Sequence, residues 1–261
     1  MPAPLKTIVA ALACALAACA LPAAAPAAPT AETLASQLDA KDREIRDAVD
    51  DWLAAAGGPP AGQAPAEVME PALLLQRKVR FLAKRPNLSR RVIAASRPKL
   101  AAQLRTMTEA ARMLRRLAGP GAGERRRKLK VGKPRSLAEL VGHYRKAERL
   151  HGIGWNYLAA INLVETKFGR VKSKSTAGAQ GPMQFIPSTW RMYGNGGDIQ
   201  DPHDATLAAA RLLRDHGAPR DYGRALYHYN PSQLYVGAVR RYAKLIARDD
   251  AAVAFLYCWG P

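Results

Sequence analysis

The sequence is poor in cysteine and in aromatic residues. Only 3 of its 261 residues are cysteine, which excludes a small scaffold held together by many disulfide bonds. Aromatic residues make up 7% of the chain and are nearly absent from residues 70–135, so this stretch has no platform on which nucleic-acid bases could stack. Internal repeats are also absent. The chain is still expected to fold around a core, because apolar residues at helical spacing fill its C-terminal half.

The positive charge of the chain is concentrated in its middle. The formal net charge is +19, and residues 70–135 alone hold 20 basic and 3 acidic residues, a net of +17. Residues 1–69 hold 4 basic and 8 acidic residues, and residues 136–261 hold 16 basic and 10 acidic ones. The charge therefore predicts an anionic partner for the middle segment, such as a phosphate polymer or a membrane surface. It says little about the C-terminal part.

The first 29 residues are typical of a secretory signal peptide. Residues 7–21 are almost entirely apolar, and residues 22–29 are only Pro and Ala. The apolar stretch is short for a transmembrane span. We therefore expect an exported protein, in the cell envelope or outside the cell. Leu16-Ala17-Ala18-Cys19 resembles a bacterial lipobox, which makes Cys19 a candidate for lipidation; ordinary cleavage further along stays open, and either processing leaves Cys258 as the one free thiol.

Composition divides the rest of the chain into segments. These are a helix over residues 30–56, a linker over 57–66, a basic helical segment over 67–117, a basic linker over 118–135 and a C-terminal domain over 136–261. The basic segment is expected to form two helices, with breaks near Pro86 and Pro98. It is either a solvated helical hairpin that positions the next domain or an electrostatic tether. The export signal and the lack of aromatic residues argue against nucleic acid.

The C-terminal domain is predicted to be all-α. Ser136 followed by Glu139 forms a capping-box pattern, which predicts the start of a helix. A second helix is expected over residues 155–168, with Gly169 as the residue that ends it. Another helix is expected to start at Asp201 as its N-cap.

Glu165 interrupts the apolar face of the second of these helices. It shares that face with three apolar residues, Leu158, Ile161 and Phe168. Burial and the negative end of the helix dipole are both expected to raise its pKa. A carboxylic acid that stays protonated near neutral pH suits general acid catalysis of glycosidic cleavage. The alternative is a Glu at the rim of the face, paired with Lys167 or Arg170.

Three blocks of residues resemble the signature blocks of the lytic transglycosylases, bacterial cell-wall enzymes related to goose-type lysozyme. The blocks are Glu165-Thr166, Gly178-Ala179-Gln180-Gly181-Pro182-Met183-Gln184-Phe185 and Tyr227-His228-Tyr229-Asn230. The resemblance covers about residues 136–248 and implies a lysozyme-like fold preceded by a helical basic extension. The residues after Glu165 and the Pro187-Ser188-Thr189-Trp190 run are closer to the membrane-bound B-type branch, and His228 departs from the soluble branch.

The resemblance also implies roles for individual residues. Glu165 would be the single catalytic acid and base, supported by Thr166, Tyr229 and Asn230. The residues expected to bind the glycan are Ser175, Gly181, Met183, Gln184, Phe185 and Tyr235. The implied reaction is cleavage of peptidoglycan between N-acetylmuramic acid and N-acetylglucosamine with closure of a 1,6-anhydro ring, by a monomer without a cofactor.

Two other functions and a metal site are the alternatives. A hydrolytic muramidase on the same fold would use Asp198 as a second carboxylate. A non-catalytic peptidoglycan-binding module would keep the groove but has no use for Glu165. A metal site could combine Asp198, Asp201 and Asp204 with His203, but capping of a helix by Asp201 explains these residues better. We therefore expect no metal.

Overall fold

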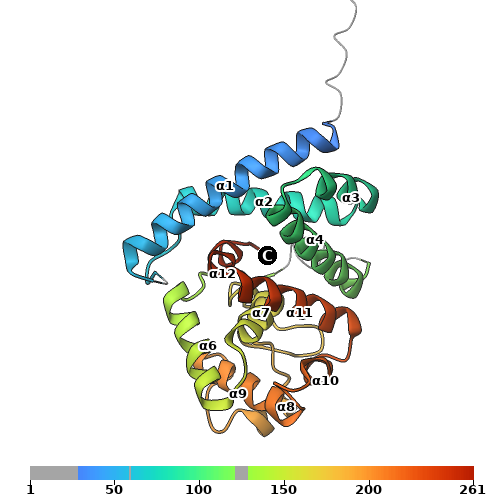
Figure 1. The fold of residues 1–261 in the computed structure, drawn as a ribbon. Helices are drawn as coiled ribbons and strands as arrows, with labels where there is room; N and C mark the ends of the chain where they lie inside the picture. Colours follow the sequence, from blue (N-terminus) through green and yellow to red (C-terminus); the bar gives the residue numbers. More distant parts are fainter. Residues whose placement is uncertain (1–28, 59, 121–128) are drawn as a thin grey trace, which may run out of the picture.

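The computed structural model describes residues 29–58, 60–120 and 129–261. Within these ranges the chain is helical and has no strand, only two isolated β-bridges, which confirms the all-α fold (Figure 1). The helices are α1 (Ala31–Ala56), α2 (Ala66–Ala83), α3 (Pro86–Ala95), α4 (Pro98–Ala118), α6 (Leu137–His151), α7 (Trp155–Thr166), α8 (Pro187–Tyr193), α9 (Pro202–Asp215), α10 (Tyr222–Tyr229), α11 (Gln233–Arg248) and α12 (Asp250–Tyr257). The predicted signal peptide and Cys19 lie outside the described residues, apart from residue 29, and so do residues 121–128 of the predicted linker.

The basic segment forms three helices, whereas two were expected. Pro86 and Pro98 each stand at the start of a helix, where the missing N–H of proline costs nothing. Both prolines therefore act as helix starts, so the stretch between them becomes the short helix α3.

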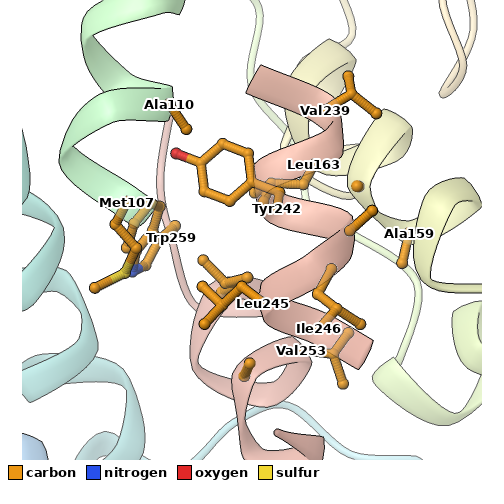
Figure 2. Packing of buried hydrophobic residues seen from close by; sticks show 14 of the residues in the cluster. Met107, Ala110, Ala159, Leu163, Val239, Tyr242, Leu245, Ile246, Val253 and Trp259 are labelled. Atoms are coloured by element: carbon orange, nitrogen blue, oxygen red, sulfur yellow. The ribbon is translucent and has the colours of Figure 1, made fainter. Parts of the chain in front are cut away.

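The apolar face of the basic segment is buried, while many of its cations are exposed. Helix α4 packs along α11 of the C-terminal domain (Figure 1). In Figure 2, Met107 and Ala110 of α4 face Tyr242 and Leu245 of α11. All four side chains are buried. The N-terminal helices and the C-terminal domain consequently share one hydrophobic core.

The chain end adds a second connection between the two halves. Helix α12 contacts α1, α2, α7 and α11. Beyond it, the Gln76 side chain exchanges hydrogen bonds of 2.7 and 3.1 Å with the backbone of Gly260. Arg80 donates to the carbonyl oxygens of Gly260 and Pro261. Trp259 is buried beneath this contact. The end of the chain is thus held against α2.

Helix caps in the C-terminal domain follow the predicted pattern. The Ser136 hydroxyl accepts from the Glu139 N–H over 3.2 Å at the start of α6. Asp201 accepts from the Asp204 N–H over 3.0 Å at the start of α9. The predicted helix over residues 155–168 is too long, because α7 ends at Thr166.

Two features bear on location and on thiol chemistry. Across the described ranges, none of the helices combines the length and the apolar character needed to cross a bilayer. Cys258 is a buried free thiol, and burial raises its pKa to about 12. Because the thiolate is the reactive form, Cys258 is a packing residue and not a nucleophile.

Candidate active site

Helix α7 places Glu165 beside a sharp reversal of the chain. The helix ends one residue later, and then Lys167, Phe168 and Gly169 have positive φ angles of 53°, 59° and 80°. Phe168 is fully buried and fixes this reversal in the core. Glu165 is partly buried and lines a cavity, through which a ligand can reach it.

A buried hydrogen-bond network ties the end of α7 to the loop that follows. The Thr166 hydroxyl and the Asn162 amide both donate to the carbonyl oxygen of Pro182, over 2.6 and 2.7 Å. The amide oxygen of Asn162 accepts from the Tyr144 hydroxyl over 2.6 Å. In the described part of the chain no hydrogen bond joins Thr166 to Glu165. Thr166 therefore holds the loop at Pro182 and does not hold Glu165 directly.

Tyr235 reaches Glu165 from α11. Its hydroxyl donates to Oε1 of Glu165 over 2.7 Å. Burial raises the pKa of Glu165 to about 7, although the hydrogen bond from Tyr235 and the charge of Lys167 both lower it. Burial and Glu165 raise the pKa of Tyr235 well above its ordinary value, so this hydroxyl stays protonated as a donor. Near pH 7 both forms of Glu165 are populated, which suits a group that first gives and then takes a proton.

Tyr229, on α10, packs beside Tyr235 and the loop that follows α7. Its ring lies parallel to that of Tyr235, at 6.2 Å between centroids, and its hydroxyl donates to the carbonyl oxygen of Met183 over 2.7 Å. Phe185 meets the Tyr229 ring at 5.7 Å. The side chains of Met183 and Phe185 are only 1% and 3% exposed. Both side chains are packed in the core beneath the loop, whereas the sequence led us to expect that they contact the glycan.

Glu165 opens onto a cavity of about 930 Å³, called here the Glu165 groove. This volume lies within the usual range of ligand sites. The predicted site residues that line it are Ser175, Gln184, Asn230 and Tyr235. The groove is also lined by residues of α2 and α4, including Arg115, and by Lys84, which directly follows α2. The groove thus lies between the C-terminal domain and the basic N-terminal helices.

Basic residues dominate the charge of the groove. The charged residues that line it are Arg80, Lys84, Arg115, Glu165 and Lys167. Among the described residues on its walls, Glu165 is therefore the one carboxylate. A ligand in the groove meets a single acid and a cationic opposite wall.

Gly181 does not line the groove but fixes the loop that does. Its φ is +75°, and a Cβ at this position would overlap the carbonyl oxygen of Ile199. Its own carbonyl oxygen accepts from the backbone and the side-chain amide of Gln184, both over 3.1 Å. The close approach needs glycine, and it sets the position of Gln184 on the groove wall.

The acidic cluster at the start of α9 is occupied by structural hydrogen bonds. Asp201, His203 and Asp204 offer atoms within 4.8 Å of one another, as a metal site would. However, Asp201 caps α9, and Asp204 accepts from the Asp198 N–H over 2.9 Å and lies 3.1 Å from the His203 ring nitrogen. Asp198 does not line the Glu165 groove. This arrangement fits the helix cap that the sequence predicts.

The sequence did not predict three residues of the site, namely Lys84, Arg115 and Asn162. Lys84 and Arg115 lie on the groove, but nothing in their spacing distinguishes them from the other cations of the basic segment. Asn162 could have been found, because it is an amide inside the otherwise apolar run of residues 158–164, three residues before Glu165. A buried amide needs hydrogen-bond partners, which here lie on the neighbouring loop and on α6.

The C-terminal domain matches a known family. Residues 143–248 match the model of the family described as "Transglycosylase SLT domain". The chain is also similar to membrane-bound lytic murein transglycosylase F of Thiobacillus denitrificans, with 30% identity over 125 residues. That match covers 45% of this chain and 26% of the relative, so the chain spans about a quarter of the relative's length. No solved structure matches the chain significantly.

The family match contains most of the C-terminal side of the site. It includes Glu165, the loop at Pro182, and the two tyrosines, Tyr229 and Tyr235. The N-terminal helices that form the other wall lie before it. Residues 143–248 therefore match the transglycosylase SLT domain within an all-α fold, and this match supports the resemblance to the lytic transglycosylases.

Proposed function

We propose that the protein is a peptidoglycan lytic transglycosylase. It cleaves the β-1,4 bond between N-acetylmuramic acid and N-acetylglucosamine without consuming water and leaves 1,6-anhydromuramyl ends. The observation that carries this proposal is Glu165, a carboxyl group with a pKa of about 7 and the one carboxylate among the described residues of its groove. A conventional glycosidase needs two carboxylates.

In this mechanism Glu165 acts twice. Its protonated carboxyl donates a proton to the glycosidic oxygen, and the bond from that oxygen to C1 of the muramic acid breaks. The 2-acetamido group of the same sugar stabilises the cationic C1. The Glu165 carboxylate then takes the proton of the 6-hydroxyl, whose oxygen bonds to C1 and closes the anhydro ring. Glu165 ends protonated, as it began, and the substrate takes the part of a second carboxylate.

Two tyrosines support these steps. Tyr235 is a positioning residue, since its hydroxyl fixes Oε1 of Glu165 over 2.7 Å and stabilises the carboxylate formed after the first step. Tyr229 holds the loop that presents Gln184, because its hydroxyl donates to the carbonyl oxygen of Met183. Asn230 lies on the groove wall. We propose that Gln184, Asn230 and Ser175 contact the sugars. This assignment rests on the place of all three residues in the groove and on the signature blocks that contain Gln184 and Asn230.

A digest of purified peptidoglycan, read by mass spectrometry, tests the reaction. We expect muropeptides with anhydro ends, each one water lighter than the corresponding reducing end. Reducing ends that are lost in an Asp198→Asn variant would point to the hydrolytic muramidase instead. Strand binding without products would leave a non-catalytic binding module. The digest needs the chain with its N-terminal helices, because they share the core and form part of the groove.

We propose that the protein acts in the cell envelope. The similar protein from Thiobacillus denitrificans is described as membrane-bound, and residues 1–29 have the composition of an export signal. Lipidation of Cys19 would add an anchor. Exposed cations of residues 70–135 that do not line the groove, such as Arg91 and Lys99, would hold the protein on an anionic wall polymer or membrane surface.

The pH profile is expected to depend on Tyr235. In the free enzyme Glu165 must be protonated to act as the acid, so kcat/KM should fall as pH rises through about 7. Tyr235→Phe removes a hydrogen bond that lowers the Glu165 pKa, so the basic limb should move to higher pH while kcat falls about tenfold or more. Rates measured from pH 5 to 9 give both quantities.

Tyr242→Phe is the matched control for this variant. Tyr242 also lines the groove and is buried, but no hydrogen bond joins it to Glu165 among the described residues. In Tyr242→Phe, the fall of kcat/KM at high pH should occur at the same pH as in wild type. A limb that does not move in Tyr235→Phe, or moves to lower pH, would refute the role of this tyrosine.

A further inference from the structure

The wall that α2 and α4 contribute to the Glu165 groove is fixed relative to Glu165. Met107 of α4 is buried against α11, the helix that carries Tyr235 (Figure 2). Arg80 of α2 is held by the carbonyl oxygens of Gly260 and Pro261, over 3.0 and 3.3 Å. The helix backbone of this wall therefore has a set position along any strand that reaches the acid.

Two cations on this wall have their charge available for a ligand. Lys84 follows α2 and Arg115 lies in the last turn of α4; both are exposed and both line the groove. Within the described ranges no ion pair engages either side chain. Of the other two basic residues in the groove, Lys167 donates to the Leu163 carbonyl oxygen over 2.9 Å. Lys84 and Arg115 are therefore the cations best placed to bind an anion.

The chemistry of the substrate supplies such an anion. The sugar rings of a glycan strand carry hydroxyl and acetamido groups, which are neutral. The negative charge of peptidoglycan sits on the peptides attached to the lactyl groups of its muramic acids, because these peptides carry carboxylates. Arginine binds carboxylates with two parallel hydrogen bonds, and lysine binds them as a point charge. The cationic wall thus complements the peptides and not the sugars.

We propose that Lys84 and Arg115 bind the carboxylates of the peptide that the muramic acid beside Glu165 carries, so that the groove selects peptide-bearing strands. This inference rests on the proposed function, because it takes the glycan strand as the ligand. It gives the basic N-terminal helices a part in substrate selection. The recognition acts across the groove from the acid.

The test compares two substrates and two double variants. The substrates are glycan strands with their peptides and the same strands stripped of peptides by an amidase. The variant Lys84→Gln with Arg115→Gln removes the two groove cations. The matched control, Arg77→Gln with Arg116→Gln, removes two exposed cations from the same helices that do not line the groove. Both kcat/KM and, in a Glu165→Gln background, the Kd for each strand are measured.

We expect the groove variant to lose about threefold to tenfold in kcat/KM and in affinity on peptide-bearing strands, with no change on stripped strands. The loss should shrink at high salt, and the control should match wild type on both strands. Equal losses on both strands, or none, would overturn the inference. If the wild type releases no anhydro products but the binding difference persists, the proposed reaction is wrong and the peptide site stands.

Discussion

Replacing Glu165 by Gln is expected to reduce the release of anhydromuramyl products at least about a thousandfold. Glutamine has nearly the shape of protonated glutamic acid but cannot give up a proton to the glycosidic oxygen. The Tyr235 hydroxyl can still donate to the amide oxygen, so the groove should keep its shape. Mass spectrometry of a peptidoglycan digest gives the loss, and retained binding to glycan strands shows that the variant is folded.

The same variant has an expected effect on stability that does not depend on activity. The folded-state pKa of Glu165 is raised from 4.5 to about 7, so the folded protein disfavours the charged form. Wild type should therefore lose stability as pH rises from about 4.5 to 7, up to about 3 kcal/mol, whereas the Gln variant should not. Urea unfolding at pH 4 and pH 8 measures the difference.

An exposed glutamate provides the control for this stability effect. Glu70→Gln on α2 removes the same charge from the surface and should leave the pH dependence of unfolding like that of wild type. The expected result is a Glu165→Gln variant that releases almost no anhydromuramyl products in the digest and is more stable than wild type at pH 8. A variant that is active, or that shows no stability gain above pH 7, would contradict the role assigned to this carboxyl group.

Gly181→Ala is expected to destabilise the protein by at least about 3 kcal/mol and to abolish activity. The added Cβ would overlap the carbonyl oxygen of Ile199, and backbone atoms cannot move aside as the end of a side chain can. The residue also has a φ of +75°, which alanine adopts only at a cost. Relief of the overlap would displace Gln184, which hydrogen bonds to Gly181 and lines the groove.

Gly178→Ala is a close control for this substitution. Gly178 lies in the same loop with a φ of +80°, but nothing lies within 4 Å of the Cβ that would be added. It should lose only the conformational cost, about 1 kcal/mol. Thermal or urea unfolding of both variants separates the overlap from the backbone strain. Equal losses in the two variants would mean that contact with Ile199 does not decide the position.

Local signals in the sequence predicted the helices of the C-terminal domain and the place of Glu165. Ser136 and Asp201 cap helices as expected, because capping depends on residues only three positions apart. The end of α7 was placed two residues too late. The apolar pattern continues to Phe168, but two non-glycine residues, Lys167 and Phe168, take left-handed conformations that tertiary packing holds in place.

Contacts between distant segments could not be read from the sequence. The bond from Tyr235 to Glu165 joins residues 70 positions apart, and spacing along a helix does not show which partner a side chain will meet. The apolar face of α4 indicated a helix but did not show that α11 covers it. For the same reason Met183 and Phe185 were expected in the groove, although they are buried behind it.

The meeting of the two halves of the chain has a consequence for the chemistry of Glu165. Residues of α2 and α4 share the cavity with this carboxyl group, so they displace water from the side opposite to α7. A carboxylate with fewer hydration waters is less stable, so its proton affinity is greater. Without these helices the Glu165 carboxylate would be better hydrated, so the pKa of Glu165 would be lower. Docking of the first half of the chain would then raise the proton affinity of Glu165, which ties the acid strength of this group to the completion of folding.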